Sequence, residues 1–142
     1  MNQRFNIKGR LMGRNEHDYL NRSHWAKGRK AKEDEQAKVM AAILAARLEP
    51  MEGPVEVGVT FIEGKAKNGK LRDPDNIESG GIKVILDALK ECGIIPDDNP
   101  RIVRNLFFRF AYNATNPHVE VEIMSYRPEG RSIYYPPVIG VD

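Results

Sequence analysis

Alternating apolar and polar residues predict β-strands in four segments of the chain. The period of two is clearest at residues 55–63 and 118–125, and it is less regular at 3–11 and 101–112. One face of each strand is therefore expected to point inward. The apolar positions of these four alternations are Phe5, Ile7, Val55, Val57, Val59, Phe61, Leu106, Phe108, Phe110, Val119, Val121 and Ile123. We expect 3–11 to be an edge strand and residues 113–117 to join the last two strands as a hairpin.

Apolar residues recur every three or four positions in two other segments, which predicts helices. Residues 30–48 carry one apolar face and end before Pro50. That face would comprise Ala37, Met40, Ile43, Leu44 and Leu48. Residues 12–29 show no clear period, so we interpret them as a loop that leads into this helix or as a nucleic-acid contact.

The second predicted helix spans residues 77–92, with Asn76 as its N-cap and Gly93 at its C-terminal end. Gly80 and Gly81 weaken its first turn by ~1 kcal/mol each relative to alanine. A weak turn of this kind indicates that something approaches the helix backbone closely. With about four strands and two main helices, the fold class is predicted as α+β, a small single domain built on a mixed sheet.

Composition supports one globular domain in a chain of 142 residues, of which 41% are hydrophobic and 30% charged. We assign residues 1–126 to the domain and residues 127–142, rich in Pro, Gly and Tyr, to an extended tail. The single cysteine suits a reducing compartment. The sequence shows no membrane-spanning run and no signal peptide, so a cytoplasmic location is expected.

Charge is distributed unevenly along the chain. Residues 1–48 hold 11 Lys and Arg against 5 Asp and Glu, whereas residues 49–142 hold 11 against 15. A basic N-terminal third favours a polyanionic partner, although a solvated charged surface explains the charge equally well. Basic residues also interleave with aromatic ones in 12–29, as in proteins that bind phosphates while bases stack. The predicted DNA-binding residues are Arg14, Asn15, Arg22, Lys27, Lys67, Lys70 and Arg72.

Carboxylates cluster at both ends of the second predicted helix. Asp73 and Asp75 precede it, Asp97 and Asp98 follow it, and Lys83 lies between them in an apolar run. Carboxylate oxygens suit Mg²⁺, which can activate water for phosphodiester cleavage, and a lysine can offset charge on the phosphate. Taken alone, Asp-Pro-Asp-Asn is also a common turn and helix-cap pattern. No Cys/His cluster suits zinc, and no phosphate-binding glycine loop is present.

The run Arg72-Asp73-Pro74-Asp75-Asn76, followed by Lys83-Val84-Ile85-Leu86-Asp87-Ala88-Leu89 and Gly93-Ile94-Ile95-Pro96-Asp97-Asp98, resembles the RusA family of Holliday-junction resolvases, often carried by phages and prophages. The resemblance implies that Asp73, Asp75 and Asp98 bind the catalytic metal. It further implies that Lys83 is the essential lysine and Arg72 the basic residue before the motif. The spacer between the Asp-Asn pair and Lys83 is longer than in the best-known member, so Lys70 is an alternative candidate for the essential lysine. Asp97 is likewise an alternative to Asp98 as the third metal ligand.

We therefore predict a Mg²⁺-dependent endodeoxyribonuclease, with Mn²⁺ as a possible substitute, that resolves Holliday junctions by symmetric paired nicks in DNA recombination and repair. The resemblance implies a homodimer in a bacterial cell. A helix over 77–92 would separate Asp98 from Asp73 by ~24 Å. The chain must then fold back, or a second subunit must complete the site. The alternatives are a less selective flap or Y-junction nuclease and a DNA-binding protein without cleavage activity.

Overall fold

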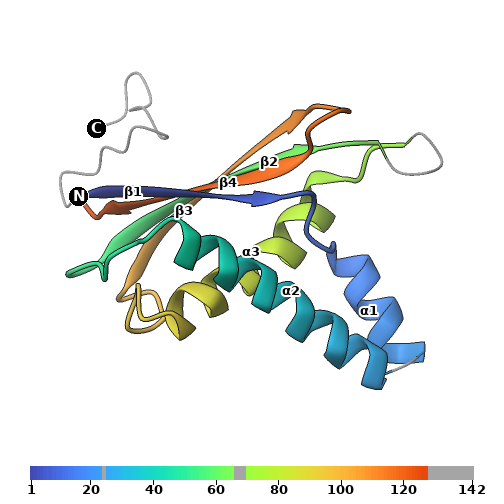
Figure 1. Ribbon diagram of the computed structural model, residues 1–142, viewed down its shortest axis with the longest axis horizontal. Coiled ribbons are helices and arrows are strands. Elements are labelled where there is room, and N and C mark those ends of the chain that lie inside the picture. Colours follow the sequence, from blue (N-terminus) through green and yellow to red (C-terminus); the bar gives the residue numbers. More distant parts are fainter. Residues whose placement is uncertain (24, 66–69, 128–142) are drawn as a thin grey trace, which may run out of the picture.

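A computed structural model describes residues 1–23, 25–65 and 70–127 as three helices and a four-stranded mixed sheet, which confirms the predicted α+β class (Figure 1). The sheet order is β1-β4-β2-β3. No helix in the described residues is long and apolar enough to cross a membrane. The elements are β1 (Asn2–Lys8), α1 (Arg14–Ser23), α2 (Trp25–Ala45), β2 (Val55–Glu63), α3 (Pro74–Glu91), β3 (Val103–Tyr112) and β4 (His118–Ser125).

The strand order corrects one prediction. β4 pairs antiparallel with both β1 and β2, and β3 pairs parallel with the other side of β2. Because β2 lies between β3 and β4, residues 113–117 connect two strands that do not pair, and the predicted hairpin is wrong. The prediction of β1 as an edge strand is confirmed, and β3 is the other edge.

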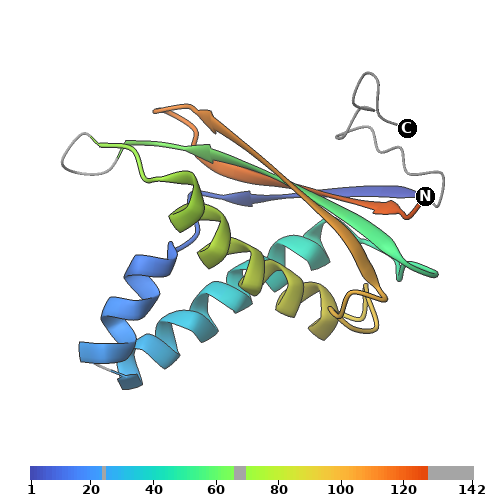
Figure 2. The same ribbon diagram turned by 180° about the vertical axis from the view of Figure 1, so that it is seen from behind.

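The helices lie on one face of the sheet, and the core forms between the two layers (Figures 1 and 2). The predicted inward residues of β1, β2 and β4 are all at most 3% exposed. On β3 the prediction holds less well, because Leu106 and Phe110 are 40% and 41% exposed. They lie on the edge strand, where fewer neighbours cover them.

The helix at 30–48 exists but is longer than predicted, and only part of its predicted apolar face meets the core: Ile43 is buried, and Met40 and Leu48 pack against the core. It begins at Trp25 and ends at Ala45, and its buried apolar residues are Val39 and Ile43. Leu44, predicted to face inward, is 67% exposed. Alanines and two leucines gave the segment several nearly equivalent apolar faces, so the period alone could not select the correct one.

α1 replaces the predicted loop, and it buries none of its residues. Its first turn is capped from a distant part of the chain, because Asn76 Oδ1 accepts a hydrogen bond of 2.8 Å from the Asn15 amide. A helix without an apolar face has no hydrophobic period, which explains why the sequence pattern did not predict it. α1 and the first turns of α2 extend beyond the sheet (Figures 1 and 2).

The two glycines of α3 admit close neighbours, as predicted, and these neighbours belong to the protein itself. A Cβ on Gly80 would lie 2.3 Å from the Met12 carbonyl oxygen, and one on Gly81 would lie 2.6 Å from the Phe61 ring. Gly80 therefore allows the segment before α1 to lie directly on α3, and Gly81 allows α3 to lie on the sheet. These contacts fix the position of the N-terminal half of α3.

Candidate nuclease site

Two exposed carboxylates stand at the N-terminus of α3. Asp73 is the N-cap residue, with extended backbone (φ −71°, ψ 144°), and Pro74 follows as the first helical residue. The Asp73 side chain makes no capping hydrogen bond. Within the described residues, neither its carboxylate nor that of Asp75 takes part in a hydrogen bond or ion pair. The helix thus begins without a side-chain cap, so both acids remain available to a ligand.

Asn76 does not cap its own helix, contrary to the prediction. Its side chain contacts the segment before α1 and accepts the Asn15 amide proton at 2.8 Å. The last residue of the Asp-Pro-Asp-Asn motif therefore fixes α1 to the start of α3. The motif thus joins the acids to α1, which lies in the segment 12–29 that we considered as a nucleic-acid contact.

Arg72 lies in a largely buried ion-pair network. Its Nε donates to Glu63 Oε1 at 2.7 Å, and its Nη1 donates to Glu16 Oε1 at 3.3 Å. The Arg72 and Glu63 side chains are only 12% and 6% exposed, and Arg10 also pairs with Glu16, at 2.7 Å. The network connects the end of β2 and the start of α1 to the residue before Asp73. The Arg72 charge is balanced by these carboxylates, which the sequence pattern did not indicate.

Lys83 and Asp98 lie progressively farther from the acid pair. Lys83 is exposed, forms an i,i+4 ion pair with Asp87 at 3.3 Å, and lies two turns from Asp75. Asp98 belongs to the segment between α3 and β3, which lies at the C-terminal end of α3 (Figure 2). The 18 residues of α3 span ~27 Å, so this segment is far from the acids at the N-terminus of the helix. In the described part of the chain, no three His, Cys, Asp or Glu side chains come close enough to hold a metal ion.

The loop around Asp98 is held by local hydrogen bonds. The Asp98 amide donates to Asp97 Oδ1 at 2.8 Å, and the Asn99 side-chain amide donates to Asp97 Oδ2 at 3.0 Å. These bonds, the Asp98 amide first, hold the pKa of Asp97 below its ordinary value. The Asp97 carboxylate thus accepts the hydrogen bonds of this turn, whereas the Asp98 carboxylate accepts neither of them.

The predicted DNA-binding residues are mostly exposed, with the exception of Arg72. Arg14, Asn15, Arg22, Lys27 and Lys70 lie on the surface, and Lys67 lies outside the described residues. Two aromatic side chains on the same helices are also exposed, Tyr19 by 64% and Trp25 by 69%. The combination of cations and exposed rings is therefore concentrated on α1 and the start of α2.

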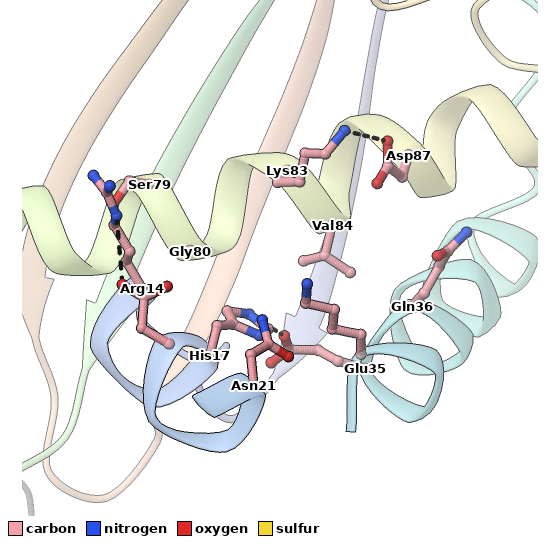
Figure 3. Close-up of a pocket in the computed structure, with 12 residues that line it drawn as sticks. Arg14, His17, Asn21, Glu35, Gln36, Ser79, Gly80, Lys83, Val84 and Asp87 are labelled. Atoms are coloured by element: carbon pink, nitrogen blue, oxygen red, sulfur yellow. Dashed lines mark hydrogen bonds and ion pairs between the residues drawn. The ribbon is translucent and has the colours of Figure 1, made fainter. Parts of the chain in front are cut away.

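A cavity between α1, α2 and α3 was not anticipated from the sequence (Figure 3). It contains His17 and Glu35, which approach each other to 3.6 Å, and it opens beside Lys83. Burial raises the pKa of Glu35, and the Met12 amide and His17 partly oppose that rise. The sequence does not indicate this pair. Glu35 belongs to the run Glu33-Asp34-Glu35, which is typical of a solvent-exposed helix face, and His17 lies on α1, which the sequence pattern did not predict.

One protein-family model matches this sequence over most of its length. The model described as Endodeoxyribonuclease RusA matches residues 13–124, which include all three helices and both groups of acids. A search of curated proteins found no match. Since the family match covers most of the chain, this protein belongs to the RusA endodeoxyribonuclease family.

Proposed function

We propose that this protein is a Mg²⁺-dependent endodeoxyribonuclease that resolves four-way DNA junctions by paired nicks, in recombination and repair. The observation that carries the proposal is the exposed pair Asp73 and Asp75, which makes no capping or ion-pair contact within the described residues of a RusA-family chain. Two hard oxygen donors at a helix N-terminus suit a hard cation.

The donor set fits Mg²⁺ or Mn²⁺ and provides no soft ligand. Asp73, Asp75 and an Asp98 carboxylate would hold the ion, which would supply activation of water and stabilisation of the leaving oxygen. Lys83 would offset charge that builds on the phosphate during cleavage. Clustered carboxylates repel a phosphate when no metal is present, so the same acids would weaken DNA binding in chelator.

A two-fold dimer resolves the separation of Asp98 from the acid pair. β2 and β3 are parallel, so Glu63 and Tyr112 share one end of the sheet. Arg72, the residue before Asp73, pairs with Glu63 at that end. Asp98 precedes β3 and lies at the other end. If the outer edges of two β3 strands pair antiparallel, Asp98 of the partner subunit comes to the end that holds Asp73 and Asp75. Each site would then need both subunits.

The surface of β3 suits such a dimer. Leu106, Phe110 and Tyr112 lie on one face of this edge strand and are 40–46% exposed. An exposed apolar edge strand pairs readily with another chain, and a symmetric pair removes both edges at once. Paired sites related by a two-fold axis also match the two opposed strands that a resolvase cuts.

The DNA would lie across α1 and the start of α2. Arg14, Arg22 and Lys27 can contact phosphates, and Tyr19 and Trp25 can stack on exposed bases. Binding dominated by phosphate contacts should weaken steeply as salt rises. A flat salt dependence would argue against this interface.

Cleavage of a synthetic four-way junction tests the proposal, with flap, Y-shaped and linear duplexes as competing substrates. We expect paired nicks in the junction with Mg²⁺ or Mn²⁺ and none in EDTA. Asp75→Asn should abolish cleavage while junction affinity in EDTA stays equal or becomes tighter. Preferential cutting of flaps would favour the broader nuclease, and binding without cleavage by the native protein would favour a DNA-binding role alone.

Mixing two inactive variants tests the shared site. Asp75→Asn and Asp98→Asn homodimers should both be inactive, but in a mixed dimer one site would keep all its carboxylates, one subunit supplying Asp73 and Asp75 and the other Asp98. We therefore expect single nicks to return on mixing and paired nicks to stay absent. A site built within one chain predicts no recovery, since every site would carry one substitution.

A further inference from the structure

The cavity between the three helices combines cations that the nuclease proposal already uses, Arg14 and Lys83, with a buried acid that it does not use. Its volume is about 400 Å³, and each helix contributes one exposed cation near its rim: Arg14 from α1, Lys32 from α2 and Lys83 from α3. At its base lie Glu35 and His17, whose side chains are only 8% and 14% exposed. Asp18 and Asp87 also line the cavity and pair with Arg14 at 3.8 Å and with Lys83 at 3.3 Å. Three cations against two carboxylates leave the rim with a small positive excess above the buried acid (Figure 3).

The buried acid has an oxygen that lacks a partner. Glu35 Oε1 accepts the Met12 amide proton at 2.5 Å, but Oε2 and the neighbouring His17 Nδ1 form no hydrogen bond within the described residues. His17 Nε2 lies 3.6 Å from Oε2, beyond hydrogen-bond distance. A buried polar atom left unpaired destabilises the folded protein. The cavity thus presents a carboxylate oxygen that a ligand with an N–H group would satisfy.

We propose that this cavity binds one nucleotide of the DNA, with its base unstacked and inserted toward Glu35 and its phosphate held by the cations at the rim. The proposal rests on the function proposed above, because DNA is the ligand. A phosphate alone has no N–H to offer Oε2 and would meet a negative charge at the base of the cavity. A nucleotide fits both parts of the cavity, because its phosphate suits the cations at the rim and its base can offer an N–H group to Glu35 Oε2.

The same chemistry selects among bases. Cytosine and adenine offer an exocyclic amino group, and guanine offers neighbouring N–H groups, all of which a carboxylate accepts. Thymine flanks its one N–H with two carbonyl oxygens, which a carboxylate repels. Unstacking a base costs least free energy where pairing is already interrupted, as at a branch point. The cavity would therefore favour an amino-bearing base next to the crossover.

The position of the cavity on α3 agrees with this role. Asp75, Ser79, Lys83 and Asp87 follow one another at intervals of four residues, so they share one face of the helix. Ser79 and Lys83 line the cavity, and Ser79 Oγ donates to the Asp75 carbonyl oxygen at 2.5 Å. The cavity thus begins one turn from the acid pair, ~6 Å along the helix. A nucleotide held there would fix the strand relative to the metal-binding end.

Titration of the full-length protein with free nucleotides tests the proposal without cleavage. Metal-free ¹⁵N-labelled protein is mixed with dCMP, dAMP, dGMP, dTMP or inorganic phosphate, and amide shifts near His17 and Glu35 are followed by NMR. We expect millimolar binding of the three amino-bearing nucleotides, and about tenfold weaker binding of dTMP and phosphate. Glu35→Gln, which keeps an acceptor for the Met12 amide, should remove the discrimination. Glu33→Gln, an exposed neighbour on α2, should leave it unchanged.

A second measurement uses the junction itself. 2-Aminopurine placed beside the crossover should brighten when the protein binds in EDTA, and Glu35→Gln should bind the junction without that increase. Equal binding of phosphate and all four nucleotides would reduce the cavity to a phosphate contact, and unchanged fluorescence would exclude base insertion. Either result overturns the inference. Nucleotide discrimination without any junction cleavage would instead refute the nuclease proposal and leave the cavity assignment in place.

Discussion

Gly80→Ala should destabilise this protein, although helix propensity alone predicts the opposite. Alanine favours a helix over glycine by ~1 kcal/mol at an interior position. In the folded chain, however, the new Cβ would lie 2.3 Å from the Met12 carbonyl oxygen and 2.7 Å from the Arg14 nitrogen. Both are backbone atoms, so no change of rotamer relieves the contact.

The magnitude follows from what must move. To restore ordinary contact, the segment before α1 must shift by about 1 Å from α3. That shift strains two hydrogen bonds, from Met12 to Glu35 and from Asn15 to Asn76. Overpacking of this kind typically costs ~1–3 kcal/mol and occasionally more. Because both clashing atoms are backbone, we take the upper end, ~3 kcal/mol, and subtract the ~1 kcal/mol gain in helix propensity. We therefore expect a net loss of ~2 kcal/mol, or ~8 °C in Tm for a domain of this size.

Thermal unfolding followed by circular dichroism measures this effect. Gly64→Ala is the matched control, because its Cβ would meet nothing closer than the Pro117 ring at 3.5 Å, so its Tm should stay close to that of the native protein. Gly81→Ala should fall between the two, since its Cβ would meet the Phe61 side chain at 2.6 Å. A Gly80→Ala variant that unfolds at the native temperature or above would show that the close approach does not constrain the fold.

Arg72→Met should cost ~3–5 kcal/mol by urea unfolding, because it leaves Glu63 buried without its partner, and adding Glu63→Gln should recover part of the loss. No recovery in the double variant would contradict the ion-pair explanation. The Asn116 carbonyl and then Glu120 raise the pKa of His118 above its ordinary value of 6.5. Its contribution to stability should be complete below pH 6.5 and disappear as the pH rises through the folded pKa, and His118→Gln should remove this component from a Tm profile against pH.

Much of the fold followed from local pattern. Strand alternation correctly identified the apolar residues of β1, β2 and β4 that meet the core, because in a strand the period of two reports which residues share a face. The periodic apolar residues likewise located α2 and α3. The acids of the candidate site were selected from residue type together with the resemblance to the RusA family, because Asp-Pro-Asp-Asn alone is equally a turn and cap pattern, and their role in metal binding stays a prediction.

Long-range contacts determined the rest. α1 is held by polar contacts such as Asn15 with Asn76, residues 61 positions apart, and it buries no residue that could create a period. Strand order depends on which edges pair across the chain, so the local turn at 113–117 wrongly suggested a hairpin. Long-range packing also determines three features of the candidate site and the cavity. These are the burial of Arg72, the separation of Asp98 from Asp73 and the close approach of His17 to Glu35. A local pattern records which face of an element is buried, but the partner of that element is chosen only when the whole chain packs.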